Sequence, residues 1–168
     1  MEHLAPPNAT LHARHPEDTQ NWAQRLADQV QPGDVICLWG DVGAGKTFFA
    51  RSLIQTLQAQ HGAFEDVPSP TFTLVQTYLA GSLEIWHADL YRLGGPDEVI
   101  ELGLAAAFDT ALCLIEWPDR LGELMPETAM HMTFTTTQSE DARDCKLSCS
   151  DSATLTRYAR CLGAQIDA

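Results

Sequence analysis

The chain has 168 residues, of which 45% are hydrophobic and 20% are charged, a balance typical of a globular protein with a sizeable core. It carries 10 Lys and Arg against 23 Asp and Glu, a formal net charge of −13, and its basic residues form no run. This charge disfavours autonomous binding of DNA or RNA, which needs a basic face, and suits either a solvated surface or docking to a basic protein partner.

The N-terminal segment contains prolines and histidines but no apolar stretch of the kind that forms a secretion signal. We expect residues 1–15 to form a flexible tail and residues 16–168 to form a single domain. No apolar run has membrane-spanning length, and five cysteines without an export signal favour a reducing, cytoplasmic compartment. The first helix is predicted to have Asp18 or Thr19 as its N-cap and to end at Pro32-Gly33.

The segment Gly40-Asp41-Val42-Gly43-Ala44-Gly45-Lys46-Thr47 matches the phosphate-binding pattern G-x-x-x-x-G-K-[ST]. It follows the apolar run 35–39, typical of a buried parallel strand, and precedes apolar residues at helical spacing. In this context the glycine-rich backbone can direct N–H groups at a phosphate. Lys46 would reach the β- and γ-phosphates, and the Thr47 hydroxyl would bind Mg²⁺. We therefore predict a nucleoside-triphosphate site, the alternative being a glycine turn that only joins a strand to a helix.

Two prolines exclude a helix from residues 67–73, whose hydroxyls suit either a loop over the triphosphate, with Thr71 as the nucleotide contact, or a rigid connector. Residues 74–78 and 83–87 are predicted to form a hairpin. Its second strand leads to Asp89, which is either a carboxylate serving Mg²⁺ or water, or a helix cap. His87 points to the same side of that strand, and an orienting or packing role is favoured because no third metal ligand has suitable spacing.

A second apolar run, 111–116, ends at Glu116 and has the form of a Walker B strand. Since Thr47 supplies one ligand of Mg²⁺, a carboxylate ending a neighbouring strand binds the ion directly or through water. We assign Glu116 to Mg²⁺ and Asp89 to the water or the outer shell, with a structural Glu116 as the alternative. Trp117 is either a core or lid aromatic or a functional one.

The remaining segments complete an α/β pattern. Short helices are expected at 96–102 and 119–124, an antiparallel hairpin at 129–135 and 145–149, and a last helix from its cap Ser152 through Leu162. The predicted fold is a P-loop NTPase-like sheet with flanking helices, a parallel core and antiparallel hairpins.

Four motifs, in order, resemble those of the TsaE (YjeE) family, the bacterial ATPases of tRNA threonylcarbamoyladenosine biosynthesis: GDVGAGKT at 40–47, SPTFTLV at 69–75, HADLYRL at 87–93 and EWP at 116–118. The resemblance implies Mg²⁺ binding by Thr47 and Glu116 and roles for Asp89 and Trp117 in ATP turnover. It also implies nucleotide contacts from Thr19 and from Arg143 of the late hairpin.

The same resemblance implies weak ATP hydrolysis by the isolated protein and partners named TsaD and TsaB, which hold the tRNA. Among rival functions, a GTPase is disfavoured because the only asparagines, Asn8 and Asn21, form no N-K-x-D motif. A small-molecule kinase is the main alternative, although its arginine-rich lid has no counterpart among the scattered arginines. A binding module whose hydrolysis is incidental is close to the family role.

Overall fold

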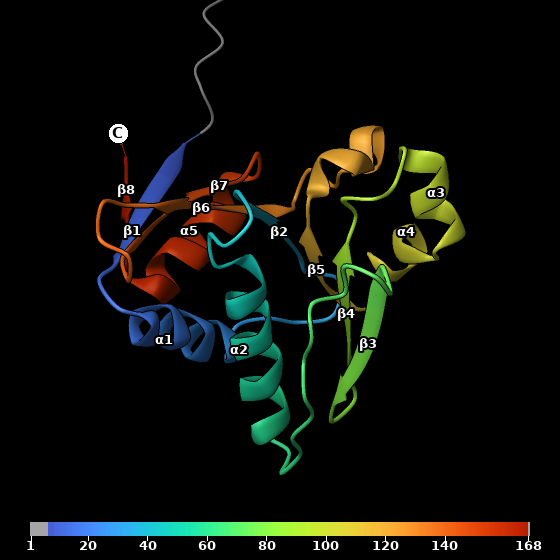
Figure 1. Ribbon diagram of the computed structural model, residues 1–168, viewed down its shortest axis with the longest axis horizontal. Helices are drawn as coiled ribbons and strands as arrows, with labels where there is room; N and C mark the ends of the chain where they lie inside the picture. Colours follow the sequence, from blue (N-terminus) through green and yellow to red (C-terminus); the bar gives the residue numbers. More distant parts are fainter. Residues whose placement is uncertain (1–6, 168) are drawn as a thin grey trace, which may run out of the picture.

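An eight-stranded sheet forms the centre of the protein, and helices cover both of its faces (Figure 1). The computed structural model describes residues 7–167. The strand order is β3-β4-β5-β2-β6-β7-β1-β8. Neighbours from β4 to β6 run parallel, and the remaining pairs are antiparallel. This topology confirms the predicted mixed α/β sheet.

The strands are β1 (Asn8–Ala13), β2 (Val35–Trp39), β3 (Val75–Ala80), β4 (Leu83–Asp89), β5 (Leu112–Glu116), β6 (Met130–Thr136), β7 (Arg143–Ser148) and β8 (Gln165–Ile166). The helices are α1 (Pro16–Ala27), α2 (Lys46–Ala59), α3 (Pro96–Glu101), α4 (Leu104–Ala107) and α5 (Ser152–Leu162), with a 3₁₀ segment, η1 (Pro118–Leu124).

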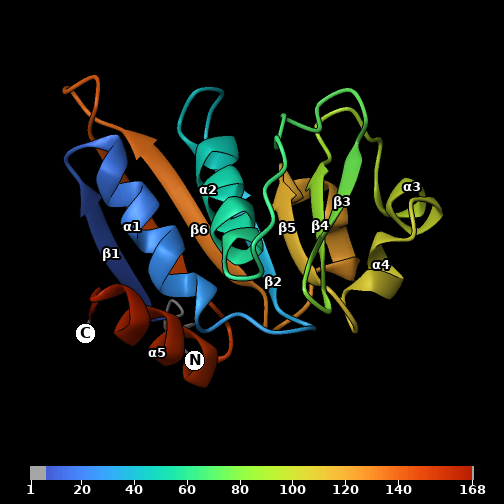
Figure 2. The same ribbon diagram turned by 90° about the horizontal axis from the view of Figure 1, so that it is seen from below.

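Two hydrophobic cores lie on opposite faces of the sheet, because side chains alternate along each strand. In β2, Ile36 and Leu38 join the core under α1, α2 and α5, whereas Val35 and Cys37 join the core under α3, α4 and η1. Figure 2 shows α1 and α2 side by side over the first of these faces. Burial on both faces explains why β2 and β5 read as continuous apolar runs.

The N-terminal segment differs from the predicted tail over part of its length. Asn8–Ala13 forms β1, which pairs with β7 and β8 inside the sheet. Ala9, Leu11 and Ala13 face the core and are buried, while Thr10 and His12 alternate with them. The expectation of a tail over residues 1–15 is therefore wrong for this strand, and residues 1–6 lie outside the described part of the chain.

Two helix caps also differ from the prediction. His15 occupies the N-cap of α1 because Pro16 takes the first helical position, and Asp18 accepts hydrogen bonds from the backbone N–H groups of Arg14 (2.8 Å) and His15 (3.1 Å). Thr19, the other predicted cap, is buried inside the first turn. Asp151, one residue before the predicted Ser152, caps α5 by accepting from the N–H of Thr154 (2.9 Å).

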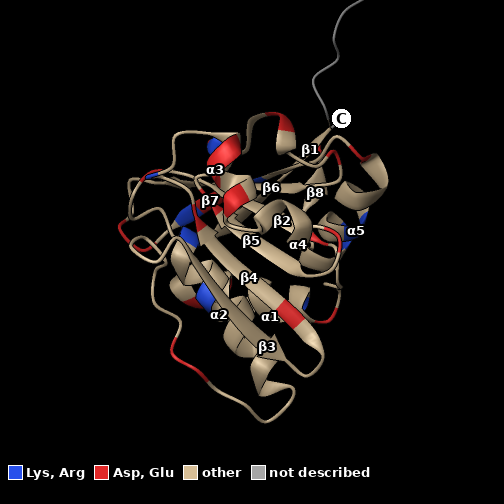
Figure 3. Cartoon of the chain, turned by 90° about the vertical axis from the view of Figure 1, so that its right-hand side faces the viewer, with Lys and Arg blue, Asp and Glu red and all other residues tan. Residues whose placement is uncertain are grey.

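Both predicted hairpins are present as antiparallel pairs, β3–β4 and β6–β7. On the face drawn in Figure 3, acidic residues mark α3, including Asp97 and Glu98 in its first turn, while Lys and Arg are few and scattered. Within residues 7–167, no helix combines the length and the apolar composition needed to cross a membrane.

Candidate functional site

Three segments far apart in the sequence meet at the carboxyl ends of β2, β4 and β5. The loop after β2 leads directly into α2, and the sheet register places Glu116 beside both Leu38 and Asp89. The loop, the strand ends and the segment before β3 enclose a cavity of about 320 Å³. Its lining includes nine residues predicted for the site: Val42, Gly43, Gly45, Lys46, Thr47, Thr71, Asp89, Glu116 and Trp117, together with Phe48 and Ser69. This is the crevice in which open α/β sheets bind ligands.

Lys46, the first residue of α2, is buried at the base of this loop. Its ammonium donates to the carbonyl oxygens of Gly40 and of Asp41 (3.3 Å) and lies 3.9 Å from the ring centroid of Trp117. Burial lowers the pKa of Lys46, and the nearby carboxylates of Glu116 and Asp89 partly offset that effect. The ammonium group of Lys46 thus lies against the loop, next to the position where a phosphate would bind.

Thr47 and Glu116 are joined directly. The Thr47 hydroxyl donates to Glu116 Oε1 (2.7 Å), and Glu116 Oε2 lies 2.7 Å from His87 Nε2. Glu116 is only 2% exposed, so the protein interior holds its carboxylate in one place. Because the hydroxyl hydrogen of Thr47 is directed at Glu116, the oxygen lone pairs of Thr47 are left for a cation.

Asp89 belongs to the same cluster, with hydrogen-bond donors of its own. Oδ2 accepts from the Thr71 hydroxyl (3.1 Å), and Oδ1 accepts from the backbone N–H of Tyr91 (3.0 Å). Thr71 is bonded in turn to Ser69 (2.7 Å between the hydroxyl oxygens). Asp89 therefore closes a turn on Tyr91 and caps no helix, since α3 begins only at Pro96, and the segment with two prolines is attached to the site through Thr71.

Trp117 has a backbone conformation that is unusual for a bulky residue, with φ 55° and ψ 55°. Its ring lies against the ammonium of Lys46 and, on another side, against the ring of Tyr91, with centroids 5.0 Å apart. Backbone strain of this kind is typical of functional sites. Trp117 is thus a wall of the cavity and not a core aromatic, and sequence reasoning missed its tilted ring contact with Tyr91.

A second cavity, of about 250 Å³, lies on the other side of the loop. Thr19 and Arg143, both implied by the family resemblance, line it together with Ala44 and the apolar side chains of Pro16 and Phe48. Arg143 donates from Nε to the carbonyl of Ala44 (3.2 Å) and from Nη2 to that of Gly43 (3.3 Å). The structure therefore brings both residues to the loop, although neither contacts the carboxylate cluster.

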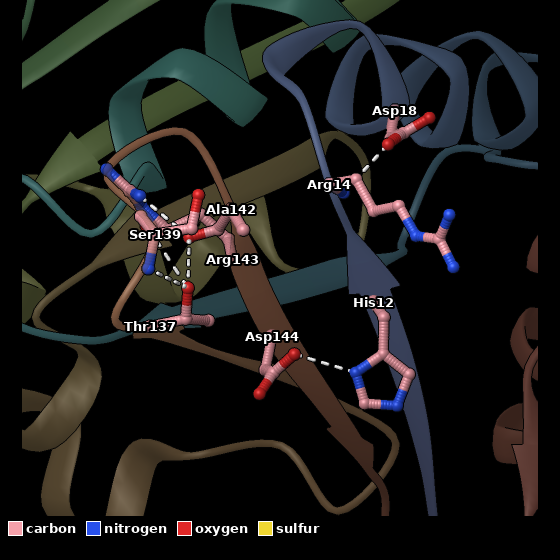
Figure 4. A network of polar contacts seen from close by, with 8 residues as sticks. All are labelled: His12, Arg14, Asp18, Thr137, Ser139, Ala142, Arg143 and Asp144. Atoms are coloured by element: carbon pink, nitrogen blue, oxygen red, sulfur yellow. Dashed lines mark hydrogen bonds and ion pairs between the residues drawn. The ribbon is translucent and has the colours of Figure 1, made fainter.

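The turn between β6 and β7 holds Arg143 in this place (Figure 4). Thr137 Oγ1 accepts from the backbone N–H of Ser139 (3.1 Å), and Arg143 Nη1 donates to the carbonyl of Ala142 (2.8 Å). One residue further along β7, Asp144 pairs with His12 of β1 at 2.7 Å. Strand β1, which the sequence analysis missed, thus supports the strand that carries Arg143.

The donor set suits Mg²⁺ better than a metal held entirely by protein. Among the described residues, no group of three or more His, Cys, Asp or Glu is arranged to hold a metal ion. Mg²⁺ is commonly bound by one or two protein oxygens together with waters and substrate phosphates. The Thr47 hydroxyl and the Glu116 carboxylate beside the glycine-rich loop 40–47 fit that pattern.

A family model described as "Threonylcarbamoyl adenosine biosynthesis protein TsaE" matches residues 13–145. Curated relatives named "tRNA threonylcarbamoyladenosine biosynthesis protein TsaE" include one from Rickettsia conorii, 43% identical over 109 residues, and one from Bacillus subtilis, 38% identical over 121 residues. The Rickettsia conorii match covers 65% of this chain and 61% of the relative, and the Bacillus subtilis match covers 71% and 73%.

The crystal structure of Bacillus subtilis YdiB superposes with a TM-score of 0.74 at 26% identity, covering 94% of this chain and 96% of that one. The matched residues 13–145 contain the loop, the carboxylate cluster and Arg143. The chain therefore belongs to the TsaE family.

Proposed function

We propose that this protein binds ATP and Mg²⁺ at the loop 40–47 and hydrolyses ATP as an accessory subunit in the synthesis of threonylcarbamoyladenosine in tRNA. The observation that carries the proposal is the hydrogen bond from Thr47 to the buried Glu116, beside Lys46 and at the start of α2. The names of the relatives supply the pathway. TsaD and TsaB are the proposed partners, contact with tRNA is through them, and the proposed compartment is the cytoplasm.

In this proposal the backbone N–H groups of the loop and of the first turn of α2 bind the phosphates, helped by the helix dipole. Lys46 exchanges the carbonyls of Gly40 and Asp41 for phosphate oxygens and neutralises charge on the β- and γ-phosphates. Thr47 and Glu116 would hold Mg²⁺, which would stabilise negative charge on the phosphoryl group. Thr19 and Arg143 line the second cavity, where the nucleoside end of ATP is proposed to lie.

Asp89 is proposed to orient the attacking water, because its carboxylate faces the cavity beside Glu116. Its bond to Thr71 couples it to the segment 69–73, which is proposed to respond to the γ-phosphate. Trp117 covers Lys46 and limits the access of bulk water to the phosphate side of the cavity. The small-molecule kinase is the weaker alternative, since no arginine within residues 7–167 lines the cavity that contains Thr47 and Glu116.

The test is ATP hydrolysis by the purified protein, alone and after addition of TsaB and TsaD, with Glu116→Ala as the control variant. The proposal predicts slow turnover that rises with the partners and is lost in Glu116→Ala. Fast turnover that is indifferent to the partners, or a phosphorylated small molecule as the product, would instead identify a free-standing enzyme or a kinase.

A further inference from the structure

The mechanism above gives no task to His87, a fully buried histidine on β4. Its Nε2 lies 2.7 Å from Oε2 of Glu116. Its Nδ1 is buried and has no hydrogen-bond partner among the described residues. A buried polar side chain with one satisfied and one unsatisfied nitrogen calls for a physical reason.

The two nitrogens indicate which tautomer is present. A proton on Nε2 gives a hydrogen bond to Glu116 and leaves only an acceptor lone pair unpaired at Nδ1. A proton on Nδ1 would bury an N–H group without an acceptor and would place two acceptors 2.7 Å apart at Nε2 and Oε2. The geometry therefore favours a proton on Nε2 that is donated to Glu116.

This bond settles how the Glu116 carboxylate is oriented. His87 pairs with Leu114 and Asp89 pairs with Glu116 across the parallel strands, so the Glu116 side chain reaches back along β5 to meet His87. Oε2 is held there, and Oε1 accepts from Thr47. Since Asp89 is held separately by Thr71 and Tyr91, the two neighbouring carboxylates keep distinct positions.

We propose that His87 is a positioning residue that fixes Glu116, so that Oε1 and the Thr47 hydroxyl form one prearranged oxygen pair for Mg²⁺. The inference rests on the proposed ATP·Mg²⁺ function. It assigns to the first residue of the HADLYRL segment a task that is separate from that of Asp89, although both lie at the end of β4. Partners that orient metal ligands typically change metal affinity 10- to 100-fold when they are removed.

The first experiment measures ATP affinity by titration calorimetry, in EDTA and across a series of MgCl₂ concentrations, for the wild type, His87→Leu and His87→Gln. We expect His87→Leu to raise about tenfold or more the MgCl₂ concentration at which the effect of MgCl₂ on ATP affinity is half-maximal, while ATP affinity in EDTA changes less than about twofold. His87→Gln keeps an N–H donor and should restore part of the effect. A role in packing alone would leave the MgCl₂ dependence of correctly folded His87→Leu unchanged, and that result would overturn the inference.

Two controls separate this role from a general effect. On a Glu116→Ala background, His87→Leu should cause no further change in the MgCl₂ dependence, because its effect passes through Glu116. The matched control is His131→Leu, which removes a sheet histidine that is hydrogen-bonded to Trp39 (2.9 Å) and not to the carboxylates. The MgCl₂ dependence of ATP affinity in this variant should match that of the wild type. A tenfold effect that persists without Glu116 would contradict the proposal. If the wild type itself failed to bind ATP, the proposed function would fail, independently of His87.

Nuclear magnetic resonance supplies a readout that needs neither a variant of His87 nor bound metal. In the wild-type protein without nucleotide, the ¹⁵N spectrum of the His87 ring should show the Nε2-protonated tautomer, and Glu116→Ala should remove the signature of its strong hydrogen bond. A proton found on Nδ1, or a spectrum that is unchanged in Glu116→Ala, would show that His87 does not hold Glu116.

Discussion

Gly40 is the tightest point of the loop, and replacing it with alanine should be far more damaging than the same change at Gly43. Gly40 has φ +138°, and a Cβ there would lie 2.6 Å from the carbonyl oxygen of Phe134 and 3.1 Å from the Cβ of Ala44. Gly43 has φ +80°, and a Cβ there would meet nothing within 4 Å. Both changes impose a backbone conformation that L-residues disfavour, but only Gly40→Ala also forces two backbones apart.

The structure gives a magnitude for each variant. The backbone penalty is about 1 kcal/mol for Gly43→Ala, taken from the cost of the left-handed region to an L-residue. For Gly40→Ala, overpacking adds about 2 kcal/mol, because the atom in the way belongs to the backbone of β6 and cannot rotate aside. We therefore expect a loss of about 3 kcal/mol in the free energy of unfolding, which corresponds to a fall in Tm of roughly 10 °C in a chain of this size.

The assay is urea denaturation and thermal unfolding, followed by far-ultraviolet circular dichroism, of the wild type and the two variants. The predicted order is wild type, then Gly43→Ala, then Gly40→Ala, with the second step larger than the first. Equal losses for the two variants would refute the reasoning, because they would show that the close approach of the loop to Phe134 does not constrain it.

Two further predictions concern the core and the dependence on pH. Phe49 is fully buried, and its ring centroid lies 5.8 Å from that of Phe134. Phe49→Ala should therefore lower the free energy of unfolding by about 3–5 kcal/mol in the same urea experiment. The side chain of Phe64 is 71% exposed, so Phe64→Ala should change that free energy by less than about 0.5 kcal/mol. Burial lowers the pKa of His131, whose Nδ1 accepts a hydrogen bond from Trp39. As the pH falls below about 6.5, this histidine therefore takes up a proton in the unfolded chain before it does so in the folded protein. Stability should therefore fall as the pH is lowered from 7 to 5, more steeply in the wild type than in His131→Phe; parallel profiles of Tm against pH would contradict this.

Much of the site could be predicted because its parts are local. The loop 40–47 has a fixed spacing, and β2 and β5 are apolar throughout because both of their faces are buried. Glu116 and Asp89 could be placed at one edge of the sheet because parallel strands end together. The sequence divided their roles only by the strength of the preceding strand, and that division stays a prediction.

Side-chain contacts between residues that are far apart in the sequence could not be predicted from local sequence patterns. The link from His87 to Glu116 joins residues on β4 and β5, and Arg143 reaches Gly43 only because β7 is folded back beside β6. Strand β1 was not predicted because Ala9 and Ala13 contribute little hydrophobicity to the sequence pattern. Their burial follows from the pairing of β1 with β7. The cap of α1 did have a local signal, since Pro16 favours the first helical position and so marks His15 as the N-cap.

The most direct test of the proposed ATP site is calorimetric titration of ATP with MgCl₂ into the wild type and Lys46→Ala, with Lys146→Ala as the charge-matched control at an exposed position on β7. We expect binding by the wild type and by Lys146→Ala, and no measurable binding by a folded Lys46→Ala, because Lys46 alone of the two lysines lies at the loop. ATP affinity in Lys46→Ala equal to that of the wild type would contradict the assignment of the site.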